Sequence, residues 1–143
     1  MILPDVNVLI YAFRSDAANH STCNSWLNGV VAGEARFGIS PLALASVARI
    51  TTNRRSYANP STLAEAFTFG DYLLGQPHCQ VVEPGERHWE IFKRLCIETD
   101  TRGGHVTDAW YAALAIEWGC EWITFDRDYA RFPGLKWQVP AAV

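Results

Sequence analysis

Apolar residues recur along this chain with two different spacings, which predict short strands and amphipathic helices in alternation. Residues 2–6 and 79–82 are short apolar runs of the kind that form buried strands. Between residues 20 and 31 the apolar side chains return every three or four positions, which is the spacing of a helix. By the same reasoning we expect further strands at 122–125 and 136–139, and further helices at 7–14, 41–52, 60–75, 87–97 and 108–118.

Capping residues mark the boundaries of two of these helices. Ser40 and Pro41 form a typical helix start, with a hydroxyl N-cap and a proline in the first turn. Thr107 is expected to cap the alanine-rich helix that follows it, and Gly119 to end that helix. The alternation of strands and helices predicts an α/β fold with a central, mainly parallel sheet flanked by helices, in a single domain over residues 1–143.

Composition excludes several classes of protein. The 143 residues carry a net charge of −3, and no apolar stretch approaches the ~20 residues that a membrane-spanning helix needs. We therefore expect no membrane partner and a cytoplasmic location. The four cysteines lie far apart, without the close spacing of a zinc site, so we expect them to be free thiols.

Aromatic and histidine side chains are not obvious parts of a binding site. Aromatic residues fall mostly at core spacing in the helices, and we expect Trp26, Phe67, Trp89 and Phe92 in the core. The histidines are expected in loops or on the surface; they are His20, His78, His88 and His105.

Three aspartates share a position relative to the predicted elements. Asp5 and Asp126 each follow an apolar strand, and Asp108 opens a helix. The carboxyl ends of parallel strands and the starts of helices line one edge of an open sheet, so these distant carboxylates can converge. Clustered carboxylates repel one another unless a cation neutralises them. A hard divalent ion with oxygen ligands fits this set, which predicts Mg²⁺, with Mn²⁺ as a possible substitute, rather than zinc.

Each aspartate also has a purely structural explanation. Asp5 can be the N-cap of the following helix, and Asp108 can lie in the first turn of its helix because the helix dipole stabilises a negative charge there. Asp126 and Asp128 can form a turn through hydrogen bonds to their own backbone. The metal hypothesis therefore depends on the coincidence of the three positions and not on any one of them.

Three strings in the sequence resemble the PIN-domain ribonucleases. They are LPDVNVLIYA at residues 3–12, VTDAWYAALAIEWG at 106–119 and WITFDRDYARFPGL at 122–135. The similarity is closest to the VapC toxins of bacterial toxin–antitoxin pairs, particularly a branch common in mycobacteria, and it spans essentially the whole chain. It implies a PIN fold and a magnesium-dependent endoribonuclease that hydrolyses RNA by a metal-activated water. It also implies a VapB-like antitoxin as partner, and a homodimer.

The resemblance implies roles for individual residues. Asp5 matches the first metal-binding acid, Asp108 the acid at the start of the penultimate helix, and Asp126 the acid after the following strand. Asp128 is a weaker neighbour of Asp126. Asn7 matches a polar position that orients the first acid.

One position departs from the family pattern. Members usually carry a glutamate in the helix after the Ser-Pro start, and this chain has Ser46 there. A serine can hold a metal-bound water but supplies no negative charge, which leaves open whether the site holds one metal ion or two. Asp128 is a candidate to compensate.

Basic residues near the predicted acids are candidates for contact with the RNA backbone. Arg49, Arg54 and Arg127 are the candidates, although each can also be an ordinary solvated charge. Among the histidines only His105 lies close in sequence to a predicted acid. The RNA target stays open, with single-stranded loops as the expected kind of site.

Two other classes of protein place carboxylates in a similar way. A catalytically inactive PIN-like module, which binds RNA or a partner without cutting, is favoured by Ser46. Phosphatases of similar layout need a second aspartate two positions after the first, where this chain has Asn7. Receiver domains need a late lysine, and Lys136 is poorly placed for that role. The sequence therefore favours the nuclease, with the inactive module as the alternative.

Overall fold

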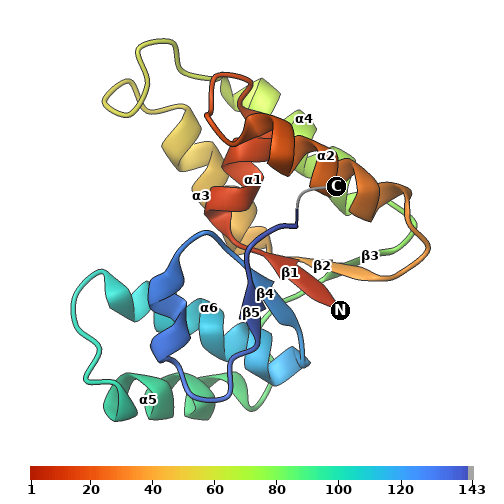
Figure 1. Cartoon of the computed structure of the whole chain (residues 1–143). Helices are drawn as coiled ribbons and strands as arrows, with labels where there is room; N and C mark the ends of the chain where they lie inside the picture. Colours follow the sequence, from red (N-terminus) through yellow and green to blue (C-terminus); the bar gives the residue numbers. More distant parts are fainter. Residues whose placement is uncertain (142–143) are drawn as a thin grey trace.

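A sheet of five parallel strands forms the centre of the computed structural model, which describes residues 1–141. The strand order is β3-β2-β1-β4-β5, so β1 lies in the middle of the sheet (Figure 1). The predicted α/β class and parallel sheet are confirmed. The strands are β1 (Ile2–Pro4), β2 (Phe37–Ile39), β3 (Cys79–Val81), β4 (Glu121–Ile123) and β5 (Trp137–Gln138).

Helices cover both faces of this sheet. Figure 1 shows α1–α4 on one face and α5 and α6 on the other. Right-handed crossovers explain this arrangement, because the chain runs outward from β1 to β3 on one side and then returns to β4 on the other. Over residues 1–141 the helices are α1 (Val6–Phe13), α2 (His20–Ala32), α3 (Pro41–Thr51), α4 (Leu63–Leu74), α5 (His88–Glu98), α6 (His105–Trp118) and the 3-10 helix η1 (Arg127–Arg131). Nowhere in that range is a helix both long enough and apolar enough to cross a membrane.

The start of α3 is capped as the sequence predicts. The Ser40 hydroxyl accepts a hydrogen bond of 3.3 Å from the Ala43 N–H, and Pro41 is the first helical residue. Gly119 ends α6 in the left-handed conformation, with φ of 66°, which a residue without Cβ adopts at little cost.

Two predicted helix starts are wrong. The last long helix, α6, begins at His105 and has Gly104 at its N-cap position, so Thr107 lies inside the first turn. Helix α4 begins after Thr62, later than the predicted start at residue 60. The Thr62 hydroxyl accepts a hydrogen bond from the Glu65 N–H, and the Glu65 carboxylate accepts one from the Thr62 N–H, which is a reciprocal capping box.

Strand β2 was not predicted from the sequence. It has only three residues, and the central one is Gly38, so no apolar alternation is visible. Gly38 is required by packing, because a Cβ built there would lie 2.7 Å from Cγ2 of Val82. The strand is therefore defined by its neighbours β1 and β3 rather than by its own sequence.

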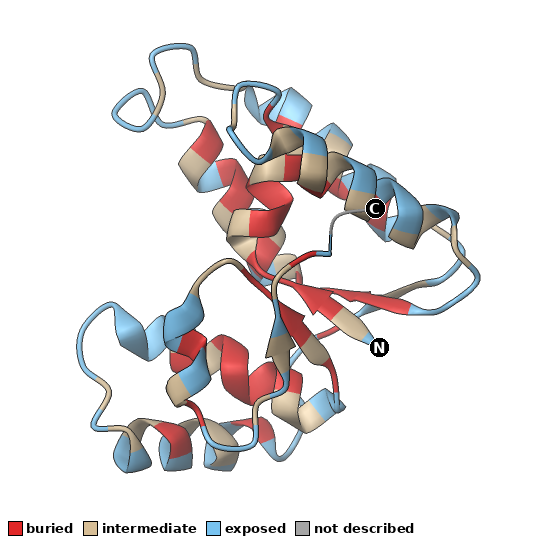
Figure 2. Cartoon of the chain, in the orientation of Figure 1, coloured by how far each residue is buried: buried red, intermediate tan, exposed pale blue. Residues whose placement is uncertain are grey.

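The core lies between the sheet and the inner surfaces of α1 and α6 (Figure 2). The prediction of a core position is wrong for two aromatic residues, because Phe67 is 58% exposed and Trp89 is 61% exposed. The expectation that His88 is a surface residue is also wrong. It is buried, and its Nε2 donates to the Trp110 carbonyl oxygen at 2.9 Å, which ties α5 to α6.

Candidate active site

The site lies where the order of the strands reverses along the chain. Strands β1 and β4 are parallel neighbours, with Leu3 opposite Trp122. Helix α1, which follows β1, lies on one face of the sheet, and α6, which precedes β4, lies on the other (Figure 1). A crevice therefore opens at the carboxyl ends of these two strands. Asp5 follows β1 directly, and Asp126 follows β4 after two residues. The parallel pairing therefore brings these two acids to the same edge, as predicted.

Asp5 serves as a helix cap and also faces the crevice. Its Oδ1 accepts a hydrogen bond of 2.6 Å from the Val6 N–H, which makes it the N-cap of α1. Its Oδ2 accepts from the Thr124 hydroxyl at 2.6 Å and from Asn7 Nδ2 at 3.3 Å. The same Asn7 nitrogen donates to Thr124 Oγ1 at 3.2 Å. The capping explanation and the functional one are thus both compatible with the geometry.

Burial makes Asp5 an unusual carboxylate. Its residue is only 6% exposed, and no salt bridge joins it to a basic side chain within residues 1–141. Desolvation raises the pKa of Asp5 to about 6, against the opposing effect of its hydrogen bonds from Thr124 and Val6. The negative charges of Asp108 and Asp126 are smaller contributors to this raised pKa. Among the described residues, no basic side chain therefore forms an ion pair with the most buried acid of the site.

Asp108 reaches the same crevice from the first turn of α6. Its Oδ2 lies 3.1 Å from His105 Nδ1, one turn earlier, and 3.7 Å from Nη2 of Arg131. The Tyr129 hydroxyl donates to its Oδ1 at 3.4 Å. Asp108 is thus held by the residues that follow β4 as well as by its own helix.

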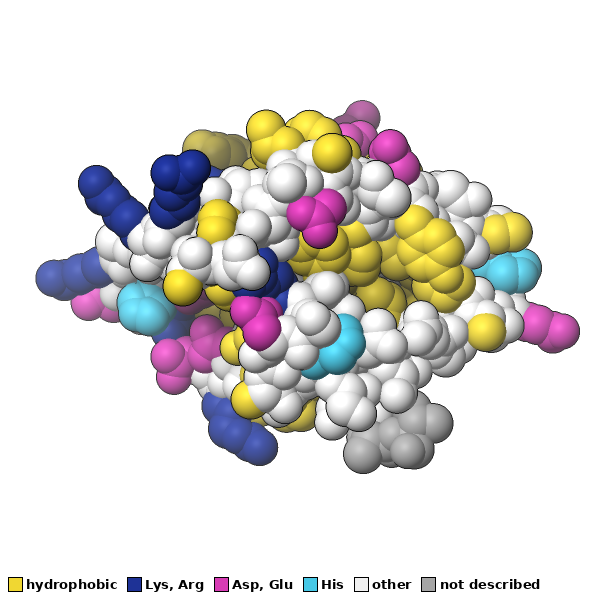
Figure 3. Space-filling view, turned by 90° about the horizontal axis from the view of Figure 1, so that it is seen from above, with side chains coloured by type: hydrophobic (Ala, Val, Ile, Leu, Met, Phe, Trp, Pro, Cys, Tyr) yellow, Lys and Arg dark blue, Asp and Glu magenta, His cyan; other side chains and the backbone are white. Residues whose placement is uncertain are grey.

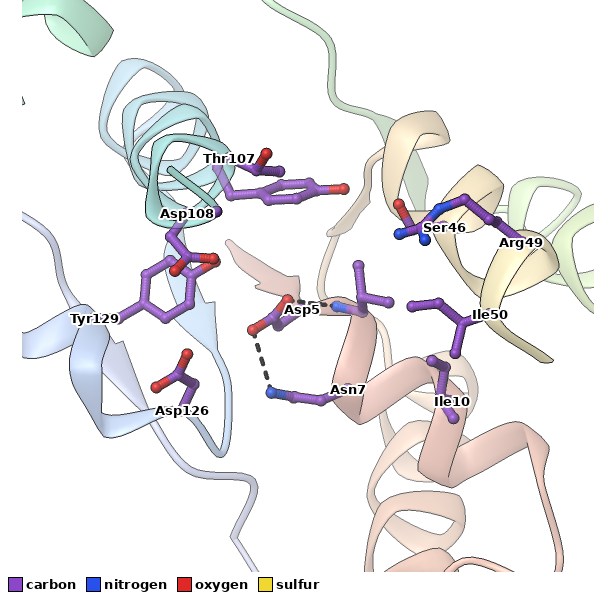
Figure 4. Close-up of a pocket in the computed structure, with 13 residues that line it drawn as sticks. Asp5, Asn7, Ile10, Ser46, Arg49, Ile50, Thr107, Asp108, Asp126 and Tyr129 are labelled. Atoms are coloured by element: carbon purple, nitrogen blue, oxygen red, sulfur yellow. Dashed lines mark hydrogen bonds between the residues drawn. The ribbon is translucent and has the colours of Figure 1, made fainter. Parts of the chain in front are cut away.

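A cavity of about 430 Å³ joins these residues. Figure 4 shows the carboxylates of Asp5, Asp108 and Asp126 turned toward the same space. The opposite wall belongs to α3, which contributes Ser46, Arg49 and Ile50. The pocket therefore has an acidic wall and a wall with a serine and one arginine.

The donor set fits a hard divalent cation. Carboxylate oxygens are ligands that Mg²⁺ prefers, and Mg²⁺ is commonly bound by one or two carboxylates with several waters retained. Over residues 1–141 no three His, Cys, Asp or Glu side chains lie close enough to form a complete metal cage. An open site that keeps waters is consistent with that finding, and Asp5 and Asp108 are the side chains that would hold the ion.

Several predicted residues lie outside the cavity. Arg49 lines it, whereas Arg54 and Arg127 are exposed and do not. Asp128 is also exposed, and its N–H donates to Asp126 Oδ1 at 2.9 Å, so it closes the turn rather than facing the other acids. Asp126 is therefore both a turn residue and part of the acidic wall.

Three further residues of the site were missed in the sequence. Thr124 is fully buried and links Asp5 to Asp126, because its hydroxyl also accepts from the Asp126 N–H at 3.0 Å. Tyr129 and Arg131 contact Asp108. All three lie within the string at 122–135, and a threonine two residues before Asp126 was the only available signal.

Comparisons with known proteins agree with this geometry. A PIN domain matches residues 2–135. The chain is 40% identical over 136 residues to Ribonuclease VapC25 of Mycobacterium tuberculosis, which covers 95% of this chain and 96% of that protein. It is 36% identical over 140 residues to Ribonuclease VapC43 of the same species, covering 98% of this chain and 95% of that protein.

Solved structures share the fold. VapBC2 from Rickettsia felis, bound to a DNA fragment from its promoter, matches with a TM-score of 0.70 at 15% identity, over 97% of this chain and 98% of that one. Mycobacterium tuberculosis VapC20, a sarcin-ricin loop cleaving toxin, matches with a TM-score of 0.68 at 16% identity, over 95% and 99% of the two chains. With the fold, the PIN match and the close relatives in agreement, the chain belongs to the PIN-domain family, in its branch of VapC ribonucleases.

Proposed function

We propose that this protein is the toxin of a toxin–antitoxin pair and hydrolyses RNA phosphodiester bonds with the help of Mg²⁺. The observation that supports this most is the group of three carboxylates around one cavity, in a chain that is 40% identical to Ribonuclease VapC25. RNA as the substrate implies that it acts in the cytoplasm. VapC ribonucleases are divalent-metal enzymes, and Mg²⁺ is the ion that best suits this set of oxygen ligands.

The three aspartates of the acidic wall are the proposed ligands of the metal ion. Asp5 and Asp108 would hold the ion directly, and Asp126 would contribute directly or through a water. When bound, Mg²⁺ orients and acidifies the attacking water and offsets the charge that builds on the phosphate oxygens. Thr124 and Asn7 fix the orientation of the Asp5 carboxylate through their hydrogen bonds to its Oδ2.

The opposite wall contributes polarity without negative charge. Ser46 lines the cavity at the position where the general family pattern has a glutamate, so the site has one acid fewer than that pattern and we propose a single metal ion. Arg49 lies beside it and can hold an RNA phosphate next to the acids. Arg54 follows the end of α3 and would contact the RNA backbone a few nucleotides farther from the acids. We assign no role in RNA or metal binding to Arg127 or Asp128.

A VapB-like antitoxin is the proposed protein partner. Figure 3 looks onto the side of α1–α4 and shows apolar side chains gathered in a hollow at the middle of that face. On α1 and α4, Phe13, Phe69 and Tyr72 line a cavity, with the ring centroids of the two phenylalanines 5.0 Å apart and Tyr72 half-exposed. Partly exposed aromatic clusters of this kind are suited to burial by a partner. Solved structures that share this fold include VapBC2 from Rickettsia felis and VapBC-1 from nontypeable Haemophilus influenzae, so the occupant we propose is the antitoxin.

The partner proposal has a direct test. Tyr72→Glu should weaken co-purification with the antitoxin, while RNA cleavage by the free toxin is unchanged. The neighbouring exposed change Asp71→Asn should affect neither. Antitoxin binding that survives Tyr72→Glu and a second change at Phe69 would exclude this surface. The homodimer that the resemblance implies remains a prediction, for which light scattering of the free toxin is the test.

Nuclease activity is tested with structured RNA, with Mg²⁺ and with a chelator. The parent protein should cleave only with the metal, and Asp5→Asn and Asp108→Asn should each remove most of the activity. Asp71→Asn, which changes an exposed acid on α4, should cleave like the parent. If Asp5→Asn cleaves as well as the parent, the proposal fails. If the parent binds RNA but never cuts it, the inactive module that Ser46 favours is the better reading.

A further inference from the structure

Arg131 lies beside the acidic wall on the Asp108 side. It ends η1, and its Nη2 lies 3.7 Å from Asp108 Oδ2. Its guanidinium lies over the ring of Phe132, 4.6 Å from the ring centroid, and that ring is buried. The side chain is 30% exposed, so it is stacked in place rather than free in solvent.

The contact between Arg131 and Asp108 is one of charge rather than of hydrogen bonding. At 3.7 Å it is too long for a hydrogen bond, and Nη2 is buried without an acceptor among residues 1–141. Asp108 Oδ2 is closer to His105 Nδ1, at 3.1 Å. A buried guanidinium nitrogen without an acceptor is costly, which indicates that the nearby negative charge keeps it there.

We propose that Arg131 is a positioning residue that competes with the divalent cation for Asp108. This inference rests on the proposed metal site. Without metal, the guanidinium offsets part of the repulsion among the three carboxylates and keeps Asp108 near the cavity. With metal, its fixed positive charge opposes the ion through the carboxylate that they share, and so it weakens cation binding.

Charge balance agrees with this role. On the acidic wall, three carboxylates with one guanidinium leave two negative charges, which suit a single divalent cation, and Arg49 on the opposite wall adds positive charge rather than a further acid. Ser46 acts in the same direction, because it adds no charge to the opposite wall. Arg131 therefore favours occupancy by one exchangeable ion over tight binding of two.

The test measures Mn²⁺ binding, by electron paramagnetic resonance of free Mn²⁺, and does not depend on cleavage. Arg131→Met keeps an unbranched side chain beside Phe132 and removes the charge. It should lower the Kd for Mn²⁺ by roughly 3- to 10-fold, since a charge a few ångströms from the ligand is removed from a partly buried site. Arg131→Lys keeps the charge and should bind Mn²⁺ within about twofold of the parent. Arg127→Met removes an exposed arginine of the same helix and should also stay within about twofold, because solvent screens its charge.

The outcomes separate this inference from the proposed function. Arg131→Met with unchanged or weaker Mn²⁺ binding would overturn the competition, as would Arg131→Lys binding as tightly as Arg131→Met. A parent protein that binds no Mn²⁺, or an Asp5→Asn variant that binds it equally well, would overturn the metal site itself. Melting curves in chelator report whether each variant folds, and Arg131→Gln replaces Arg131→Met should the latter not fold.

Discussion

The Thr124 hydroxyl donates a 2.6 Å hydrogen bond to Asp5 Oδ2, across 119 residues of sequence. Thr124 Oγ1 also accepts a hydrogen bond from the Asp126 N–H, so this one buried side chain connects the loops that follow β1 and β4. The two acids are therefore oriented relative to each other before any ion binds. Hydrogen bonds of this kind to metal-binding carboxylates are a recurring way to fix ligand geometry.

Thr124→Val should reduce RNA cleavage by about 10- to 100-fold, the usual cost of losing a partner of a metal ligand. Valine has nearly the same shape but removes the donor to Asp5 and the acceptor for the Asp126 N–H. Cleavage rates and Mn²⁺ binding should fall together. Thr124→Ser keeps the hydroxyl and should retain activity close to the parent; equal losses in both variants would indicate a packing role instead.

Asp5 should destabilise the metal-free protein at neutral pH. Its pKa of about 6 in the folded state lies above the ordinary aspartate value of 3.8, so the folded state holds more protons between these limits. The unfolding free energy contributed by this group therefore falls as pH rises from about 4 to about 6, and stays low above that.

The comparison with Asp5→Asn isolates this effect from other titrating groups. In chelator, the stability of the variant relative to the parent should increase as pH rises through that window, by up to about 3 kcal/mol between pH 4 and pH 7.5. Urea unfolding at several pH values measures the difference. Added Mg²⁺ should stabilise the parent and leave Asp5→Asn unchanged. A stability difference that does not vary with pH would contradict the raised pKa.

Gly38→Ala should destabilise the fold. The added methyl group would meet Val82 Cγ2 at 2.7 Å and Leu3 Cδ1 at 3.3 Å, in the middle of the sheet. Overpacking of this kind costs about 1–3 kcal/mol. Gly29→Ala is the control, because a Cβ there has no neighbour within 4 Å and lies in the interior of α2. Gly29→Ala should be neutral or stabilising by up to about 1 kcal/mol. Denaturant unfolding measures the free energy of unfolding of both variants.

The acidic wall was predictable because its members have fixed positions relative to strands. Asp5 and Asp126 follow β1 and β4, and parallel pairing brings strand ends together whatever their separation in sequence. The family pattern then added Asn7 and Ser46, which also line the cavity.

What could not be predicted depends on which neighbour a side chain meets. Arg127 and Arg131 are alike in sequence, but η1 leaves the first exposed and brings the second to Asp108. Helical spacing likewise placed Trp89 on an apolar face, although α5 is an outer helix that turns this residue to solvent. Periodicity identifies a face of a helix but does not say what covers it.

Ser46→Glu tests whether the missing acid limits the number of metal ions. The new carboxylate would enter the cavity from α3, opposite Asp5 and Asp108. A fourth acid should raise the Mn²⁺ stoichiometry above one per chain, or tighten the first site by roughly tenfold through the added charge. Ala45→Glu adds the same charge at the neighbouring exposed position of α3, and it should bind Mn²⁺ like the parent. Titration calorimetry distinguishes the two effects. Unchanged Mn²⁺ stoichiometry and affinity in a folded Ser46→Glu variant would mean that the α3 wall does not face the metal. The charge of the acidic wall alone would then decide how many ions bind.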